Sequence, residues 1–228
     1  MAIMDQSITN IIIAIGGLGT ASYALVDGAK AIHGGPSNHG FHHIRRVMTR
    51  LYPEGTSKID HANPLALASV LDTLYASWIN GTALTDQKAI AKSLVKLRLN
   101  GDSASHLAKV TGVNSEILAK VAKKMASGTK LVQQESDVLG RFDLILTALL
   151  DEGYQRADQA YRNSAKMWSI VVSVALAIAG GAVVGLAKPE DWAAALLIGL
   201  IATPLAPLTK DLASALQASV KAMQLLRK

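Results

Sequence analysis

Four histidines close to position 40 are of a type that binds metal ions or haem, and two arginines lie beside them. The histidines are His33, His39, His42 and His43, and the arginines are Arg45 and Arg46. A metal or haem carrier that uses His39, His42 and His43 is one hypothesis, because neutral imidazole is a common metal ligand. No carboxylate or thiolate completes a ligand shell in this stretch, and a basic loop beside anionic lipid headgroups has the same composition. We predict no bound metal and no cofactor, with these three histidines as the only candidates.

Asp102, Ser103 and His106 could supply a nucleophile and a base. No further residue makes them a catalytic triad, and Asp102 after Gly101 is typical of a residue that caps a helix. Asp151 and Glu152 are adjacent, so on a helix their carboxylates diverge. We therefore predict no catalytic residue and no enzymatic activity.

The stretch SHLAKVTGVNSEILAKVAKKM resembles a helix-turn-helix, with Ala108, Gly112 and Val113 at its small, turn and following apolar positions. In that case five residues would lie on a recognition helix and reach DNA. They are Asn114, Ser115, Glu116, Lys120 and Lys124. Glu116 would repel phosphate, and two short helices joined by a glycine suit any small helical domain. A membrane-tethered DNA-binding regulator that uses residues 104–124 is the alternative function, and nucleic acid is not a partner that we expect.

The glycines of IIIAIGGLGTAS could also belong to a dinucleotide-binding loop after a strand. That motif needs Gly or Ala where Ser22 stands, and an acidic residue at the end of a second strand about 20 residues later. The sequence there reads GGPSNHGFHHIRR and has no acid. We therefore interpret Gly16, Gly17 and Gly19 as helix-packing residues.

The composition favours a helical membrane protein. Half of the 228 residues are hydrophobic, only 18% are charged, and no cysteine is present to form a disulfide or a thiolate site. Residues 6–26, 167–187 and 192–209 carry no charge. At about 1.5 Å per residue, a helix of this length can cross a hydrocarbon core of about 30 Å. Three transmembrane helices are therefore expected, the last two joined as a tight hairpin.

The positive charges set the expected orientation. Lysines and arginines follow the first uncharged stretch, precede the second and follow the third. Because positive charge is retained on the cytoplasmic side, we expect the N-terminus outside. The central domain and the C-terminus are then cytoplasmic, and the membrane is the bacterial inner membrane.

Small residues recur at every fourth position of the uncharged stretches. The second stretch has Ser169, Ser173, Ala177, Gly181 and Gly185, the third has Ala195, Gly199 and Thr203, and the first has Gly17 and Ala21. Small residues allow the close packing on which helix association in lipid depends. These helix-packing residues could contact one another within the chain. We favour a lateral partner, which is another copy or another membrane subunit.

Parts of the sequence resemble an uncharacterised bacterial membrane protein family. Its stretch FDE.MDR..GWYKR precedes a C-terminal span, and Asp151, Glu152, Arg156 and Tyr161 match it in register. The ending GLIATPLAPLTKDLASAL is similar to the family's ending, with Gly199 and Pro204 in place, and NPLALASVLDTL is similar to its segment before the first soluble helix. Ala160 and Asn163 depart from the pattern. The resemblance implies one N-terminal span, a cytoplasmic helical region and C-terminal spans, and implies no activity.

We therefore predict an all-α integral membrane protein with three transmembrane helices and a cytoplasmic helical domain. The expected divisions are an N-terminal transmembrane helix at 1–29, a His- and Gly-rich juxtamembrane loop at 30–62, a cytoplasmic helical domain at 63–166, a transmembrane hairpin at 167–209 and an amphipathic helix at 210–228. Apolar spacing predicts helices at 63–81, at 85–99, and from 136 into the second span. The predicted function is a non-catalytic anchor or scaffold, an accessory subunit of a larger membrane assembly, with the lipid bilayer as a further partner.

Overall fold

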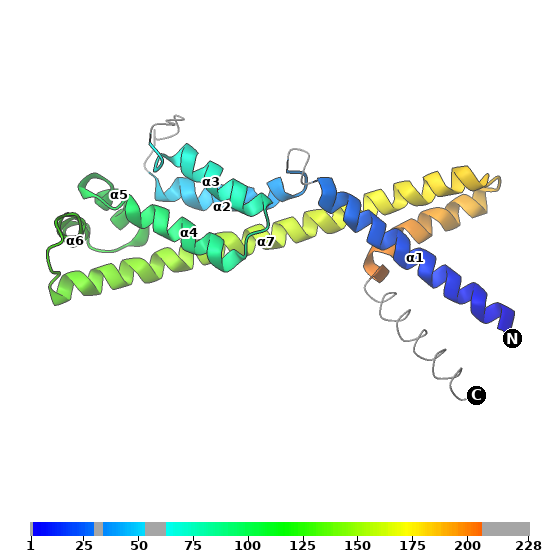
Figure 1. Ribbon diagram of the computed structural model, residues 1–228, viewed down its shortest axis with the longest axis horizontal. Helices are drawn as coiled ribbons and strands as arrows, with labels where there is room; N and C mark the ends of the chain where they lie inside the picture. The colour runs from blue at the N-terminus through cyan, green and yellow to red at the C-terminus, as the bar shows by residue number, and fades with distance from the viewer. Residues whose placement is uncertain (1, 30–33, 53–62, 207–228) are drawn as a thin grey trace. The chain divides into compact units, whose positions relative to one another are not determined.

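All regular elements in the described residues, which are 2–29, 34–52 and 63–206, are helices in this computed structural model (Figure 1). The helices are α1 (Ala2–Gly28), α2 (Ser37–Leu51), α3 (Leu67–Ile79), α4 (Leu84–Leu97), α5 (Gly101–Thr111), α6 (Ser115–Ser127) and α7 (Gln133–Val184). A further helix covers residues 189–206. The all-α prediction is confirmed for these residues, and the amphipathic helix predicted at 210–228 lies outside them.

The chain divides into two compact units. Unit 1 comprises Met1–Pro36 and Arg162–Lys228, and unit 2 comprises Ser37–Tyr161. Helix α7 contributes to both, since it continues without a break from Gln133 to Val184. This confirms that the helix expected from residue 136 runs on into the second uncharged stretch.

Within the described residues, two helices are long and apolar enough to cross a membrane. They are α1, through its stretch Ile11–Gly28, and α7. Only 22% of the apolar stretch of α1 and 17% of that of α7 is buried, whereas the core helix of a water-soluble protein would be mostly covered. The third predicted span extends beyond the described residues.

Helix α2 occupies a segment that the sequence predicts as loop. Residues 30–62 were expected to be irregular because Gly and Pro are frequent there, but Ser37–Leu51 is helical. The reason is an apolar stripe at helical spacing, formed by Phe41, Ile44, Met48 and Leu51, all of them buried. Burial of this stripe in unit 2 outweighs the cost of a glycine within the helix.

Gly40 is required where α2 crosses its neighbours. A Cβ atom at this position would lie 2.6 Å from the Ala157 carbonyl oxygen and 2.6 Å from Cζ2 of Trp78. The indole Nε1 of Trp78 donates a hydrogen bond of 3.0 Å to the carbonyl oxygen of Ser37. The start of α2 is therefore fixed against α3 and α7 at the closest approach that glycine permits.

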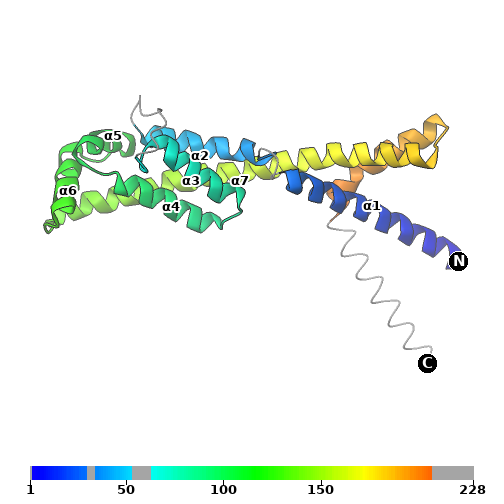
Figure 2. The same cartoon turned by 45° about the horizontal axis from the view of Figure 1, so that its top comes forward.

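The core of unit 2 combines buried residues of α2 to α6 with those of the first part of α7, and both views place these helices at that end of α7 (Figures 1 and 2). Helix α7 contributes buried residues at intervals of four, four, four and three. They are Phe142, Leu146, Leu150, Tyr154 and Ala157. The helices expected at 63–81 and 85–99 are present as α3 and α4, and Gly81 ends the first of them with a φ of 70°.

Candidate functional site

The small-residue stripes of α7 and of the helix at 189–206 face one another in unit 1. A Cβ atom at Gly199 would lie 2.6 Å from Cα of Val174 and 3.1 Å from the carbonyl oxygen of Ser173. One at Gly181 would lie 3.4 Å from Cζ3 of Trp192. Gly181 comes after Ser173 in α7, but its contact Trp192 comes before Gly199 in the partner helix. The two helices therefore run antiparallel. This register brings Ser169 to the layer of Thr203 and Ala177 to the layer of Ala195.

Three hydroxyl groups buried in unit 1 have no hydrogen-bond partner among the described residues. They belong to Ser169, Ser173 and Thr203. Leaving a buried hydroxyl unpaired costs about 1–3 kcal/mol. The close approach of the two backbones is shown at Gly199, whose added Cβ would meet Cα of Val174.

The last two glycines of the stripe predicted for the second uncharged stretch differ in burial. Gly181 is buried, whereas Gly185 is exposed and has a φ of 79°. Helix α7 ends at Val184, and the next helix begins at 189. Gly185 therefore forms the turn of the predicted hairpin, because the left-handed conformation favours glycine, and it takes no part in the helix interface.

Of the three glycines of α1 that were interpreted as helix-packing residues, Gly16 and Gly19 lie on the buried face and Gly17 does not. A Cβ atom at Gly19 would collide with the Ala202 carbonyl oxygen and lie 2.8 Å from Cβ of Ala206. Gly16 and Ser22 share this buried face, and Ser22 Oγ donates a hydrogen bond of 2.8 Å to the carbonyl oxygen of Leu18. The predicted packing residues Gly17 and Ala21 are exposed. Spacing alone could not choose between the two small-residue faces of α1.

The opposite faces of the unit 1 helices carry large apolar side chains. Exposed positions include Ile11, Ile13, Leu25, Trp168, Val171, Ile178, Val183, Leu196, Leu197 and Leu200. Small residues thus lie inside unit 1 and bulky ones outside. An outer surface of this kind is stable against lipid chains and costly in water.

The candidate metal ligands lie on α2. His39 and His42 are exposed and His43 is half-buried, and His42 Nε2 accepts a hydrogen bond of 2.8 Å from Nη2 of Arg46. Burial lowers the pKa of His43, and the positive charges of Arg46, His42 and Arg156 lower it further. Among the described residues, no three His, Cys, Asp or Glu side chains are placed to hold a metal ion.

Helices α5 and α6 form the helix pair in which a helix-turn-helix was considered (Figure 2). Gly112 makes the turn with a φ of 68°, and Asn114 caps α6 by accepting a hydrogen bond of 3.0 Å from the backbone of Ile117. However, Lys124 donates a hydrogen bond of 2.7 Å to Glu135, which is buried. Hydrogen bonds from Lys124 and from the Val132 backbone hold the pKa of Glu135 below its ordinary value. Lys124 is thus used to attach α6 to α7.

Ser103 and His106, the suspected nucleophile and base, each bond to a backbone carbonyl oxygen. Ser103 Oγ donates to the Arg98 carbonyl oxygen at 2.6 Å and completes a capping box with Asn100, which caps α5 in place of the expected Asp102. His106 Nε2 lies 3.0 Å from the carbonyl oxygen of Arg50. Both side chains thus have structural roles in unit 2.

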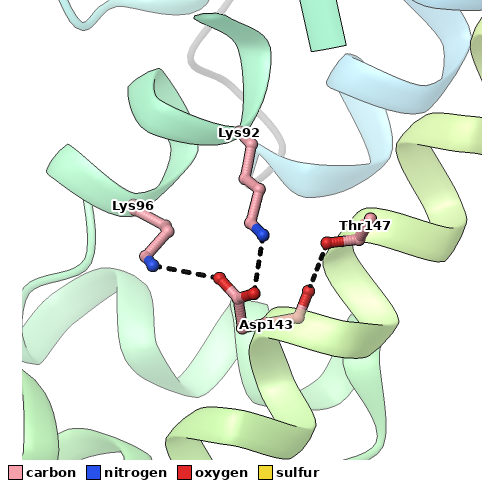
Figure 3. Close-up of polar contacts among 4 residues, drawn as sticks. All are labelled: Lys92, Lys96, Asp143 and Thr147. Atoms are coloured by element: carbon pink, nitrogen blue, oxygen red, sulfur yellow. Dashed lines mark hydrogen bonds and ion pairs between the residues drawn. The ribbon is translucent and has the colours of Figure 1, made fainter. Parts of the chain in front are cut away.

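A group of ion pairs joins α4 to α7, and the sequence did not predict it. Lys92 and Lys96 both bind the carboxylate of Asp143, at 2.6 and 3.0 Å, as Figure 3 shows. Burial raises the pKa of Asp143, but the bonds and charges of the two lysines lower it by more, so the net shift is downward. Lys88, one turn before Lys92 in α4, binds Asp151, about two turns after Asp143 in α7, at 2.6 Å. The fourfold spacing of the lysines was the available signal, although their partners are distant in sequence.

The chain's small-residue interface, its basic helix α2 and its α4–α7 ion pairs are thus the features from which a function can be argued. Comparison of the chain with protein-family models, with characterised proteins and with solved structures finds no match in any of the three.

Proposed function

We propose that this chain is a multi-pass membrane protein whose three transmembrane helices are α1, the second part of α7 and the helix that begins at 189. The observation that carries the proposal is the arrangement of unit 1, with small residues such as Ser173 and Gly199 inside and bulky residues such as Val171 and Leu197 outside. A water-soluble helical protein instead places its large apolar side chains in the interior.

The proposed topology follows from charge. Arg45, Arg46 and Arg50 follow the first span and Lys166 precedes the second, so the positive-inside tendency places unit 2 and the C-terminus in the cytoplasm of a bacterial inner membrane. Because the chain has no cysteine, one introduced at exposed Ser115 in unit 2 can be tested alone. A membrane-impermeant maleimide should label it only after the cells are permeabilised, and labelling of intact cells would contradict this orientation.

We further propose that the protein is a non-catalytic anchor, an accessory subunit that holds unit 2 at the membrane for a larger assembly. The contacts of Gly199 and Gly19 favour internal packing of the stripes, so unit 1 can serve as the anchor by itself. Unit 2 is then the part offered to a partner. Its exposed apolar residues Leu97, Met125, Val132 and Leu144 are candidates for that contact.

The test is to extract the tagged protein from its own membranes in a mild detergent, size it on a native gel and identify co-migrating proteins by mass spectrometry. A large species with reproducible partners is expected. Phe142→Ala is the test variant for unit 2, since it removes a fully buried side chain there and makes no change in unit 1. It should lose the partners while the chain stays in the membrane fraction. A species no larger than a detergent-bound monomer or dimer would refute the accessory-subunit proposal.

A further inference from the structure

Helix α2 presents an unusually basic surface away from the core of unit 2. Its sequence contains three arginines and three histidines and no acidic residue. His42, Arg46 and Arg50 recur at every fourth position, so they share one side of the helix, with Arg45 beside them, and all four are exposed. We call these four residues the basic face.

The arginines of the basic face are not neutralised by acids in the described part of the chain. Arg46 instead donates to His42 at 2.8 Å, and the guanidinium of Arg45 lies 5.8 Å from the centre of the Phe41 ring. Burial lowers the pKa of neighbouring His43, and the charges of Arg46 and His42 on this surface lower it further. An anion placed on this surface would be attracted by several cations at once.

The positive surface continues from α2 onto α5. An open hollow of about 540 Å³ is lined by Arg50, His106, Lys109 and Val110. The contact of 3.0 Å between His106 Nε2 and the Arg50 carbonyl oxygen holds the two helices together at its edge. Among the described residues that line the hollow, three are basic and none is acidic, so it suits a phosphate group.

The position of α2 in the chain indicates which anion it would meet. Residues 29–36 alone separate α2 from the apolar helix α1, and residues 162–167 alone separate the end of unit 2 from Trp168, an exposed aromatic residue of the type that anchors helices at bilayer surfaces. A basic surface tethered this closely to a bilayer is exposed to a high local concentration of anionic headgroups.

We propose that the basic face binds the phosphate groups of anionic phospholipids and so holds unit 2 against the cytoplasmic surface of the membrane. This inference rests on the proposed membrane location and adds a lipid partner that the transmembrane anchor alone does not require. Each arginine is expected to change the ratio of docked to undocked unit 2 by about fivefold.

The test uses the full chain with Thr49→Cys, an exposed position of α2, labelled with a donor fluorophore. The protein is reconstituted into nanodiscs that contain an acceptor on the lipid headgroups, either in purely zwitterionic lipid or with about one third phosphatidylglycerol. Energy transfer should be higher with phosphatidylglycerol and fall toward the zwitterionic value at high salt. Arg46→Gln with Arg50→Gln should lower the docked ratio about 25-fold.

The matched control is Lys120→Gln with Lys123→Gln, which removes the same charge from exposed positions of α6 and should leave energy transfer unchanged. Equal transfer in both lipids would overturn the proposal, as would an equal loss in the two double variants. Failure of the chain to co-elute with the discs is a separate outcome, which would refute the membrane location itself and this inference with it.

Discussion

Gly199 offers the most direct test of the helix interface in unit 1. Replacement by alanine places a Cβ atom 2.6 Å from Cα of Val174 and 3.1 Å from the carbonyl oxygen of Ser173. Both neighbours are backbone atoms of a continuous helix and cannot rotate away as a side chain would. The helices must therefore separate, and every small-residue contact along the register is weakened.

The size of the effect can be bounded. Overpacking of a close contact costs about 1–3 kcal/mol, while alanine gains about 0.5–1 kcal/mol over glycine within a helix. Gly180→Ala shares the gain without the cost, because a Cβ atom there has no neighbour within 4 Å. The two variants should thus differ by about the overpacking cost alone, roughly 1–3 kcal/mol.

The assay is reversible unfolding of the full chain in mixed micelles with rising dodecyl sulfate, followed by circular dichroism. As a second measurement, cysteines introduced at Ala177 and Ala195, which the register places in one layer, should form a disulfide quickly in the parent and more slowly with Gly199→Ala. The reasoning fails if Gly199→Ala is as stable as Gly180→Ala, or if the disulfide forms equally fast in both.

Three further predictions concern unit 2. Gly40→Ala should destabilise it by about 1–3 kcal/mol, since the added atom meets a backbone carbonyl oxygen at 2.6 Å, whereas Gly140→Ala, with open space, should be neutral or gain about 0.5–1 kcal/mol in the same thermal melt. Phe142→Ala, at a fully buried position, should cost about 3–5 kcal/mol in denaturant titration. Because the pKa of Asp143 is lower in the folded state than its unfolded value of about 3.9, its contribution is present above that pH and lost as pH falls through the folded pKa. Asp143→Asn should therefore be less stable than the parent at pH 7 by roughly 1 kcal/mol and should converge with it on acidification; a constant difference down to pH 2 would contradict this account.

The sequence was sufficient for the helices whose own spacing carries the information. The apolar residues of α3 and α4, and the unbroken α7, follow from periodicity alone. The sequence did not predict helix α2, because Gly34, Gly35 and Pro36 are typical of a loop and the loop was predicted for the whole segment 30–62. Helix α2 contains Gly40 because Trp78 and Ala157 pack closely against it. Contacts with residues so distant in sequence cannot be predicted from the local pattern.

The candidate sites divide in the same way. The stripe of Ser173 and its partner Gly199 could be read from fourfold spacing, because each helix has one face of small residues. In α1 small residues occur on two faces, and Gly17 and Gly19 were both predicted to pack, so only the position of the neighbouring helix shows that Gly19 does. The pairing of Lys92 with Asp143 joins residues 51 positions apart, and many lysines and aspartates could be paired equally well from sequence.

The turn at Gly185 has a consequence for how the chain is made. If α7 and the helix at 189–206 span a bilayer, the part that must be translocated between them is only residues 185–188, with Glu190 and Asp191 just beyond. With a link this short, one helix cannot be inserted into the lipid before the other. The two would enter as a preassembled pair, with the unpaired hydroxyls of Ser173 and Thr203 already enclosed and never presented to the hydrocarbon during biogenesis.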